Sequence, residues 1–294
     1  MSSRRFTNAC WRFNYLYGET IKIPVWLRAM KPTTNIAVRA ARQAGSVLMR
    51  YFDQVDSLKV TQKSRNDFVS EVDKAAEEAI ISTIRQSYPD HSILAEETGS
   101  HDGNDFQWVI DPLDGTTNYL HGLPQFSISI ALKHRGILES AVVYDPLKNE
   151  LFTADKGNGA FLNDRRIRIK SHKSLEGALI GTGIPFRDQR FIDHYLGMLK
   201  DMVKDTAGIR RPGSAALDFA WVACGRMDGF WELGLSQWDF AAGVLLVKEA
   251  GGTVTDLNGG EKYFETGNVV TANVKLHQQM LQLIKPHLDD KLKA

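Results

Sequence analysis

The sequence predicts a layered fold that mixes helices and strands, of the α/β or α+β type. Apolar residues recur at helical spacing in the early and late parts of the chain, and short apolar runs bounded by turn residues occupy the middle. No Pro/Ser-rich linker, low-complexity run or internal repeat divides the 294 residues. We therefore expect one continuous domain over residues 30–294, preceded by an extension over residues 1–29.

Two helices are expected first. Apolar Ile36, Ala40, Val47 and Leu48 predict a helix over about 34–52. The run from Ser70 to Asp73 resembles a capping box and is followed by apolar residues at helical spacing. These are Val72, Ala76, Ala79, Ile80 and Ile84, and Tyr88-Pro89 should end this second helix.

Short strands should follow. The apolar runs lie at 92–95, 108–110, 126–132, 140–145, 150–154 and 175–183. In the run at 126–132, FSISIAL, large apolar residues alternate with small ones, which is typical of a strand buried on both faces. Helical patterns return at 214–225 and 240–250, and Gly251-Gly252 should end the second of them. A last amphipathic helix should begin near Val274.

Charge and cysteine content limit the possible functions. With 36 Lys+Arg against 35 Asp+Glu, the formal charge of +1 predicts no strong direct binding to nucleic acid. No apolar run approaches the ~20 residues of a membrane span, so no membrane association is expected. Two cysteines, Cys10 and Cys224, cannot form a disulfide framework and suit a reducing cytoplasm.

The segment WVIDPLDGTTNYLHG, residues 108–122, carries the first candidate site. Asp111 follows a predicted strand, and Pro112 should hold it in an extended conformation. A hard divalent cation such as Mg²⁺ would turn the repulsion between Asp111 and Asp114 into attraction. Backbone N–H groups near Gly115 could then bind a phosphate at a helix start. The alternative, a turn in which Asp114 is simply an N-cap, explains the second aspartate equally well.

Other acidic residues follow the same pattern. Glu96-Glu97 come directly after the run at 92–95, so they should either emerge beside Asp111 at neighbouring strand ends or lie in a solvated loop. Asp239 precedes the helix at 240–250, where it could be a cap instead of a ligand. Asp73 could likewise only cap its own helix.

Three segments resemble the signatures of the inositol monophosphatase family, in the family's order. They are AEETGS, WVIDPLDGTTNYLHGLPQFSISIAL and WDFAAGVLLVKEAGG. The segments NIAVRAARQAG, SRNDFVSEVDKAAE and RRPGSAALDFAWVACGRMDGFWELGLSQWDFAAG resemble the bacterial SuhB branch of that family more closely. The likeness runs from about Met30 to the C-terminus. It implies the αβαβα sandwich shared with fructose-1,6-bisphosphatase, and usually a homodimer.

The resemblance also implies the site residues. One Mg²⁺ would be held by Glu96, Asp111 and the carbonyl of Leu113, and a second by Asp111, Asp114 and Asp239. Asp73 and Thr116 would orient the attacking water, with Glu97 in support. Phosphate would lie on the N–H groups of Gly115 and Thr116. The alcohol portion of the substrate would contact Arg210, Gly213, Ser214, Ala215 and Glu232.

The implied activity is hydrolysis of a phosphate monoester with two or three Mg²⁺ ions, often inhibited by lithium. Inositol 1-phosphate is the default substrate, and glycerol 2-phosphate, sugar phosphates and fructose 1,6-bisphosphate are alternatives. Members of the SuhB branch are also partners of the antitermination complex on RNA polymerase, with the other Nus factors, during ribosomal RNA synthesis. That non-catalytic role is the second function that the resemblance implies.

The likeness does not cover residues 1–29. Arg4, Arg5 and Arg12 give this segment the look of a transit peptide, yet no small-residue cleavage site follows a long apolar core. Met30 stands just before Lys31-Pro32 and the first predicted helix. We expect either that Met30 is the natural start or that the extension is disordered and dispensable.

Overall fold

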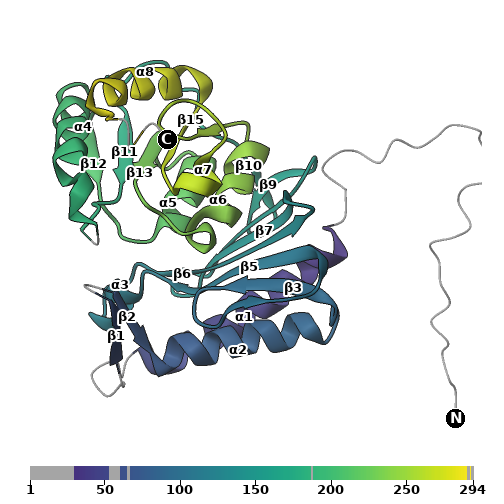
Figure 1. Ribbon diagram of the computed structural model, residues 1–294. Coiled ribbons are helices and arrows are strands. Elements are labelled where there is room, and N and C mark those ends of the chain that lie inside the picture. The colour runs from purple at the N-terminus through teal and green to yellow at the C-terminus, as the bar shows by residue number, and fades with distance from the viewer. Residues whose placement is uncertain (1–29, 53–59, 65–66, 187, 290–291, 293–294) are drawn as a thin grey trace, which may run out of the picture.

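Alternating layers of helix and sheet make up the fold of the computed structural model, which describes residues 30–52, 60–64, 67–186, 188–289 and 292 (Figure 1). In order, the layers are α1 with α2, an eight-stranded sheet, α5 with α6, a five-stranded sheet, and α4 with α8. This is the αβαβα arrangement that the family resemblance implied. Residues 1–29, and with them the expectations for Met30 as a start, lie outside the described residues.

The large sheet has the strand order β10-β9-β8-β7-β6-β5-β3-β4. Its strands are antiparallel neighbours except for β3 and β5, which run parallel. Every residue of β6 except the last is buried, because helices cover both faces of the sheet. The strands are β3 (His91–Ala95), β4 (Gly99–His101), β5 (Asn104–Asp114), β6 (Ser127–His134), β7 (Ile137–Asp145), β8 (Glu150–Asp155), β9 (Gly159–Leu162) and β10 (Arg165–Ile167).

Helices α1 (Pro32–Phe52) and α2 (Glu71–Arg85) pack on the outer face of this sheet. Their buried residues recur at helical spacing, as in Ala37, Ala40, Ala44 and Leu48, so both predicted helices are confirmed. The alanines let α1 lie close to the sheet. Gly45 is part of the same face, and a Cβ there would lie 2.8 Å from the Tyr144 ring.

The inner layer consists of α5 (Ala215–Ala223) and α6 (Gln237–Glu249), which contact each other and both sheets. These helices lack a polar face. In α6 the residues from Phe240 to Val247 are all apolar and buried, and in α5 the one charged residue is Asp218. A helix that is apolar all round belongs in the interior of a protein. Both helices were predicted from the sequence, with bounds that differ by a few residues.

The small sheet has the order β12-β11-β13-β15-β14. Its strands are β11 (Leu179–Thr182), β12 (Gly208–Arg210), β13 (Gly229–Glu232), β14 (Thr253–Thr255) and β15 (Val269–Ala272). Helices α4 (Ile192–Asp205) and α8 (Val274–Ile284) cover its outer face, where Tyr195, Met198 and Met280 pack against Trp231 and its neighbours. The predicted start of the last helix at Val274 is confirmed, and Asn273 caps it.

The remaining described elements are short. They are the β1 (Val60–Ser64) and β2 (Asp67–Ser70) hairpin, α3 (Thr116–Leu120), α7 (Tyr263–Thr266) and two 3₁₀ turns at Gln189–Phe191 and Lys285–His287. No helix in the described ranges is long and apolar enough to span a membrane. The sequence prediction omitted α4, α7 and several strands, and it placed one strand over 175–183 where the structure has only Leu179–Thr182.

Candidate active site

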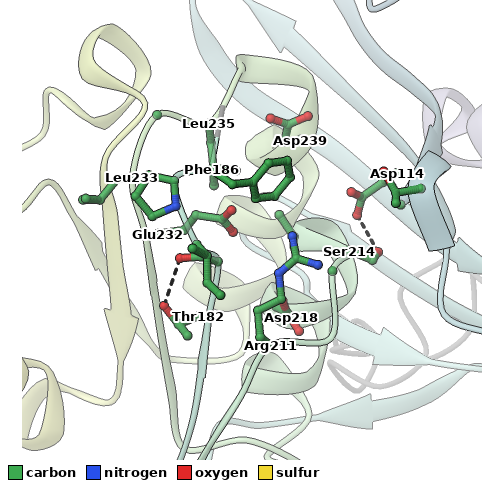
Figure 2. A pocket seen from close by; sticks show the side chains of 18 of the residues that line it. Asp114, Thr182, Phe186, Arg211, Ser214, Asp218, Glu232, Leu233, Leu235 and Asp239 are labelled. Carbon is green, nitrogen blue, oxygen red and sulfur yellow. Dashed lines mark hydrogen bonds between the residues drawn. The ribbon is translucent and has the colours of Figure 1, made fainter. Parts of the chain in front are cut away.

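One pocket brings most of the predicted site residues together, although they come from five separate segments of the chain (Figure 2). Its described lining contains Glu96, Asp111, Leu113, Asp114, Gly115, Thr116, Gly213, Ser214, Ala215, Glu232 and Asp239. The inner helices α5 and α6 begin at this pocket, and β11 and β13 of the small sheet end there.

A bulge in β5 explains how Asp111 and Asp114 come to share a site. Asp111 pairs with Ser129 of β6 and Asp114 pairs with Ser127, so three steps along β5 oppose two along β6. In a regular strand, residues three apart point to opposite faces. The extra residue brings both aspartates to the same face. Pro112, which has no N–H to donate, lies within this bulge. The expectation that the strand ends before Asp111 was wrong, because β5 continues to Asp114.

Glu96 lies beside Asp111, as the sequence led us to expect. Ala95 of β3 pairs with Ile110 of β5, and the Glu96 N–H donates to the Ile110 carbonyl at 3.2 Å. Because the two strands are parallel, the next residue on each, Glu96 and Asp111, emerges at the same edge.

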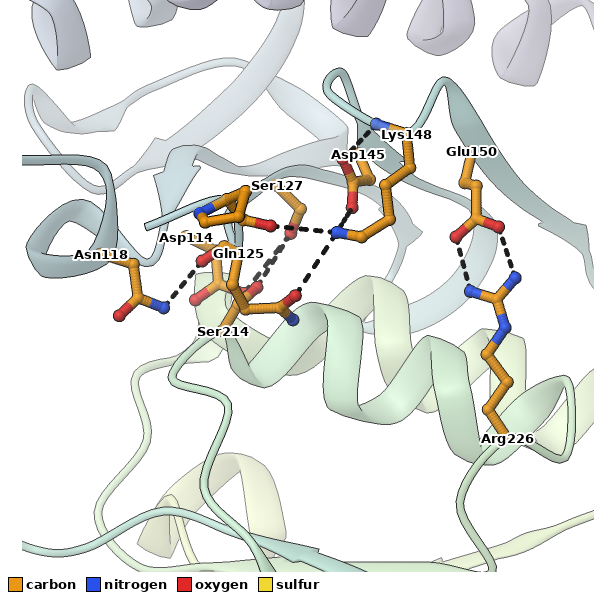
Figure 3. A network of polar contacts seen from close by, with 10 residues as sticks. Asp114, Asn118, Gln125, Ser127, Asp145, Lys148, Glu150, Ser214 and Arg226 are labelled. Carbon is orange, nitrogen blue, oxygen red and sulfur yellow. Dashed lines mark hydrogen bonds and ion pairs between the residues drawn. The ribbon is translucent and has the colours of Figure 1, made fainter. Parts of the chain in front are cut away.

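Asp114 connects the large sheet to α5 (Figure 3). Its Oδ2 accepts hydrogen bonds from Ser214 Oγ at 2.5 Å and from the Ala216 N–H at 2.8 Å. The Ala216 N–H is one of the donors that the first turn of α5 leaves unpaired. Asp114 therefore does cap a helix, but this helix is α5, and not the segment at 116–118 as the alternative interpretation proposed. The residue before that segment, Gly115, is the N-cap of α3 and uses no side chain.

Asp239 is the third residue of α6, so the alternative that it is an N-cap was also wrong in position. One of its oxygens accepts the Ser236 N–H at 2.7 Å. Ser129 Oγ of the large sheet donates to the Trp238 carbonyl at 3.2 Å, which fixes the first turn of α6 against β6.

The acidic cluster is strongly destabilised by its own charge. Burial and the charges of Glu96, Asp114 and Asp239 raise the pKa of Asp111 well above its usual range. Burial, then Glu96 and Asp114, likewise raise the pKa of Asp239. Burial raises the pKa of Asp114 to about 6, although the hydrogen bonds from Ser214 and Ala216 oppose that rise. A bound cation would remove this repulsion.

The donor set fits a hard divalent cation by its chemistry, since carboxylates and the Leu113 carbonyl are the oxygen ligands that Mg²⁺ prefers. With the side chains as they stand, no group of three or more His, Cys, Asp or Glu residues in the described ranges is arranged to hold a metal ion. Asp114 and Asp239 are instead hydrogen-bonded to protein donors.

Thr116 contacts both Asp73, the other residue predicted to orient the water, and the Leu113 carbonyl, a predicted metal ligand. Its hydroxyl lies 3.1 Å from Asp73 Oδ1 and 3.0 Å from the Leu113 carbonyl, and it can donate its proton to either. Asp73, at 1 % exposure, reaches this hydroxyl from α2. Thus Asp73 does not line the pocket itself but contacts it through Thr116.

Two glycines and an asparagine hold the turn next to Thr116. Gly115 has a φ of 96°, and a Cβ there would lie 3.0 Å from the Gln125 carbonyl. Gly213 has a φ of 90°, and its Cβ would lie 2.7 Å from the Arg211 guanidinium. Asn118 Nδ2 donates to the carbonyls of Gln125 at 2.7 Å and Pro212 at 2.8 Å. These contacts join α3 to the start of α5.

The structure places three predicted residues outside the pocket lining: Asp73, as described above, Glu97 and Arg210. Glu97 lies in the turn after β3, where Glu77 of α2 accepts its N–H at 2.8 Å and that of Thr98 at 2.9 Å. Arg210 is exposed and lies outside, whereas its neighbour Arg211 is the one basic side chain among the described lining residues. Buried Glu77 was missed because it looks like a surface acid in AAEEA, and no sequence pattern singles out Arg211 or Asp218.

Residues 29–289 match the inositol monophosphatase family. The chain belongs to that family. Its SuhB branch is indicated by a protein of Pseudomonas aeruginosa named Nus factor SuhB, which is 53% identical over 270 residues, covering 90% of this chain and all of that protein.

Solved structures of the family agree with the fold. The extragenic suppressor protein suhB from Bartonella henselae superposes with a TM-score of 0.86 at 42% identity, covering 88% of this chain and 100% of the other. An IMPase of Thermotoga maritima gives a TM-score of 0.81 at 36% identity, covering 89% of this chain and 100% of the other. The family's layered α/β fold is therefore the fold of this protein.

Proposed function

We propose that this protein is a Mg²⁺-dependent phosphatase that hydrolyses inositol 1-phosphate to myo-inositol and phosphate. Membership of the inositol monophosphatase family supports the reaction class. The observation that carries the proposal is the convergence of Glu96, Asp111, Asp114 and Asp239 on one pocket beside Thr116. So much buried negative charge is costly unless a cation compensates for it.

The metal ligands would be Glu96, Asp111, Asp114, Asp239 and the Leu113 carbonyl. When bound, two or three Mg²⁺ ions supply an activated water and stabilise the charge on the leaving oxygen. No covalent intermediate with the protein is required.

The chain's own residues would position the reactants. Asp73 Oδ1 accepts a hydrogen bond from the Thr116 hydroxyl. A lone pair on Thr116 Oγ1 is then free to accept a hydrogen bond from the attacking water. The N–H groups of Gly115 and Thr116 would hold the phosphate, and Gly213, Ser214, Ala215 and Glu232 would contact the alcohol. Arg210 stays a predicted substrate residue, although in this structure Arg211 is the arginine that lines the pocket.

The test is release of phosphate from purified protein. Inositol 1-phosphate, glycerol 2-phosphate, a sugar phosphate and fructose 1,6-bisphosphate should each be assayed with Mg²⁺ and with a chelator. We expect Mg²⁺-dependent release that is fastest with inositol 1-phosphate, and inhibition by lithium. Absence of release from all four substrates would refute the proposal.

A second function is favoured by the relatives. Proteins of Pseudomonas aeruginosa and Escherichia coli that are 53% and 51% identical to this chain are named Nus factor SuhB. We propose that this protein also joins a transcription antitermination complex, as a cytoplasmic homodimer acting through protein contacts. The variant Asp111→Asn separates the two functions, because a cell that carries it should keep the transcription role and lose the phosphatase.

A further inference from the structure

Asp218 has no role in the chemistry described above, yet it lines the same pocket from the first turn of α5 (Figure 2). It is 1 % exposed, and its Oδ1 has no hydrogen-bond partner among the described residues. The buried carboxylate of Asp155, by contrast, accepts hydrogen bonds from the Lys31 N–H, Ser140 Oγ and Thr34 Oγ1.

An unpaired buried carboxyl oxygen is costly and calls for an explanation. Because Asp218 is one of the residues that line the pocket, a ligand that enters the pocket can supply the missing partner. The Ala216 N–H in the first turn of α5 is already paired, because it donates to Asp114 and not to Asp218. A capping role therefore does not account for Asp218.

The charges around Asp218 indicate what kind of group it meets. Burial and the charges of Glu232 and Asp114 raise its pKa well above the usual range, and Arg211 opposes this. Arg211 lies over the Phe186 ring at 5.3 Å, and both Arg211 and Glu232 line the pocket. The positive charge of Arg211 is offset by the negative charge of Glu232, whichever protonation state Asp218 has. This wall therefore offers no net positive charge for a second phosphate.

We propose that Asp218 is a specificity residue, whose carboxyl group hydrogen-bonds a hydroxyl of the alcohol portion of the substrate and so selects an uncharged polyol. A hydroxyl can both donate to Oδ1 and accept from a carboxylic acid, so it satisfies Asp218 in either protonation state. A site built to pair with a hydroxyl rejects an analogue that lacks it, because the buried group then stays unpaired. The proposal rests on the phosphatase function proposed above.

The experiment compares Asp218→Leu and Asp218→Asn with the wild type on two substrates in saturating Mg²⁺. Inositol 1-phosphate carries hydroxyls, and para-nitrophenyl phosphate carries none. For Asp218→Leu we expect KM for inositol 1-phosphate to rise about tenfold, the equivalent of one hydrogen bond to a buried polar group. Its KM for the aryl phosphate and its kcat should stay within about twofold of wild type. Asp218→Asn keeps the polar group and should largely retain the wild-type KM.

Asp228→Asn is the matched control. Asp228 is also a buried carboxyl with an unpaired Oδ1, but it lies outside the pocket and its other oxygen accepts the Leu179 N–H. This control should leave both KM values unchanged. An equal rise in KM for both substrates in Asp218→Leu, or no rise for either, would overturn the role given to Asp218.

A binding measurement keeps the two proposals distinguishable. Free myo-inositol at high concentration should raise the melting temperature of the wild type and of Asp228→Asn, and should raise that of Asp218→Leu much less. If the wild type released no phosphate from any monoester, the phosphatase proposal would fail, and this comparison would still decide the role of Asp218. Equal stabilisation of all three proteins by myo-inositol, or no stabilisation of the wild type, would refute it.

Discussion

The electrostatic cost of the acidic cluster arises because four carboxylates lie close together in one pocket. They belong to Glu96, Asp111, Asp114 and Asp239. The extra residue in β5 places Asp111 and Asp114 on one face, and the parallel pairing of β3 and β5 adds Glu96. Burial, together with the charges of Glu96 and Asp114, raises the pKa values of Asp111 and Asp239. The metal-free protein therefore carries an electrostatic cost at neutral pH that a divalent cation relieves.

Removing one of these carboxylates should separate activity from stability. Asp111→Asn or Asp239→Asn should lower Mg²⁺-dependent hydrolysis by at least about a hundredfold, since even a residue that only supports a ligand can cost that much. The melting temperature in a chelator should stay the same or rise, because one source of repulsion is gone. Near-normal turnover of either variant at saturating Mg²⁺ would mean that the ligand assignment is wrong.

The pH dependence of stability provides a second test, centred on Asp114. Its pKa is raised to about 6 in the folded protein, against about 3.9 in an unfolded chain. The folded state then holds the proton more tightly, so this contribution to stability is complete below about pH 4 and is lost as the pH rises through 6. The loss is on the order of 3 kcal/mol.

Melting curves in a chelator between pH 4 and 7.5 would measure this effect. We expect Asp114→Asn to melt several degrees above the wild type at pH 7 and close to it at pH 4. Mg²⁺ should raise the melting temperature of the wild type at pH 7 more than that of the variant. A constant difference between the two proteins across this pH range would contradict the assignment.

Substitution of Thr116 tests whether its hydroxyl positions the attacking water. Thr116→Val keeps the shape of the side chain and removes the hydroxyl that lies 3.1 Å from Asp73. Loss of general-base assistance typically costs 10²- to 10⁴-fold, so kcat should fall by at least about a hundredfold with a smaller change in KM. Thr116→Ser should be mild. Large and equal losses in both variants would indicate a packing role instead.

At the scale of helices and strands, the sequence predicted most clearly the segments with strong local patterns. The buried faces of α1 and α2 recur at helical spacing, and β6 to β8 are continuous apolar runs between turns. The prediction missed α4, whose buried face is Tyr195, Met198 and Met202, because Gly197 interrupts a pattern with many charged residues. That glycine is required by close packing, since a Cβ there would lie 2.4 Å from the His287 ring.

The site was less predictable than the fold because its geometry depends on contacts between distant segments. The acids of the family signatures are visible in the sequence, and the pocket does gather them. The bulge at Pro112, the use of Asp114 to cap α5, and the pairing of Glu77 with the Glu96-Glu97 turn have no local signature. Arg211 and Asp218 are placed in the pocket by the packing of α5, which only the tertiary structure reveals.

The packing of α5 against α6 should be sensitive to a single methyl group. A Cβ at Gly243 of α6 would lie 2.4 Å from Phe219 Cβ of α5, and neither atom can move without moving a helix backbone. Gly243→Ala gains about 1 kcal/mol of helix propensity but adds overpacking that costs about 1–3 kcal/mol. We expect a net loss of stability and, because α5 and α6 carry Ser214 and Asp239, lower phosphatase activity.

Thermal melting and phosphate release of Gly243→Ala would be measured together. The melting temperature should fall by a few degrees, and kcat should fall with it. A higher melting temperature would show that α5 and α6 can separate without cost and that the close contact does not fix the pocket.

At the scale of the whole molecule, the pocket lies where three of the layers meet. Asp111 and Asp114 belong to the large sheet, Ser214 and Asp239 to the starts of the inner helices, and Glu232 to the small sheet. The acids that would bind metal therefore come from the large sheet and the inner helices, and the residues that would bind the alcohol come from the inner helices and the small sheet. Any change that shifts one sheet relative to the other should alter both binding steps together.

The outermost layer is fixed to the large sheet close to Met30. The Lys31 N–H donates to Asp155 Oδ2 at 2.9 Å, and Lys31 Nζ forms an ion pair with Glu139 at 2.9 Å. Thr33 Oγ1 lies 3.0 Å from Ser140 Oγ, and Thr34 Oγ1 donates to the buried Asp155. These contacts hold the first turn of α1 without any residue before position 31.

We therefore propose that residues 30–294 contain everything that folding and activity require, and that residues 1–29 are dispensable. A shortened chain that begins at Met30 keeps every contact just described, so its melting temperature should match that of the full-length protein within about a degree. Its Mg²⁺-dependent phosphate release should also be unchanged. A fall of several degrees would correspond to a loss of more than about 1 kcal/mol. In that case residues 1–29 would contribute stabilising contacts, and they would have to be counted as part of the folded domain.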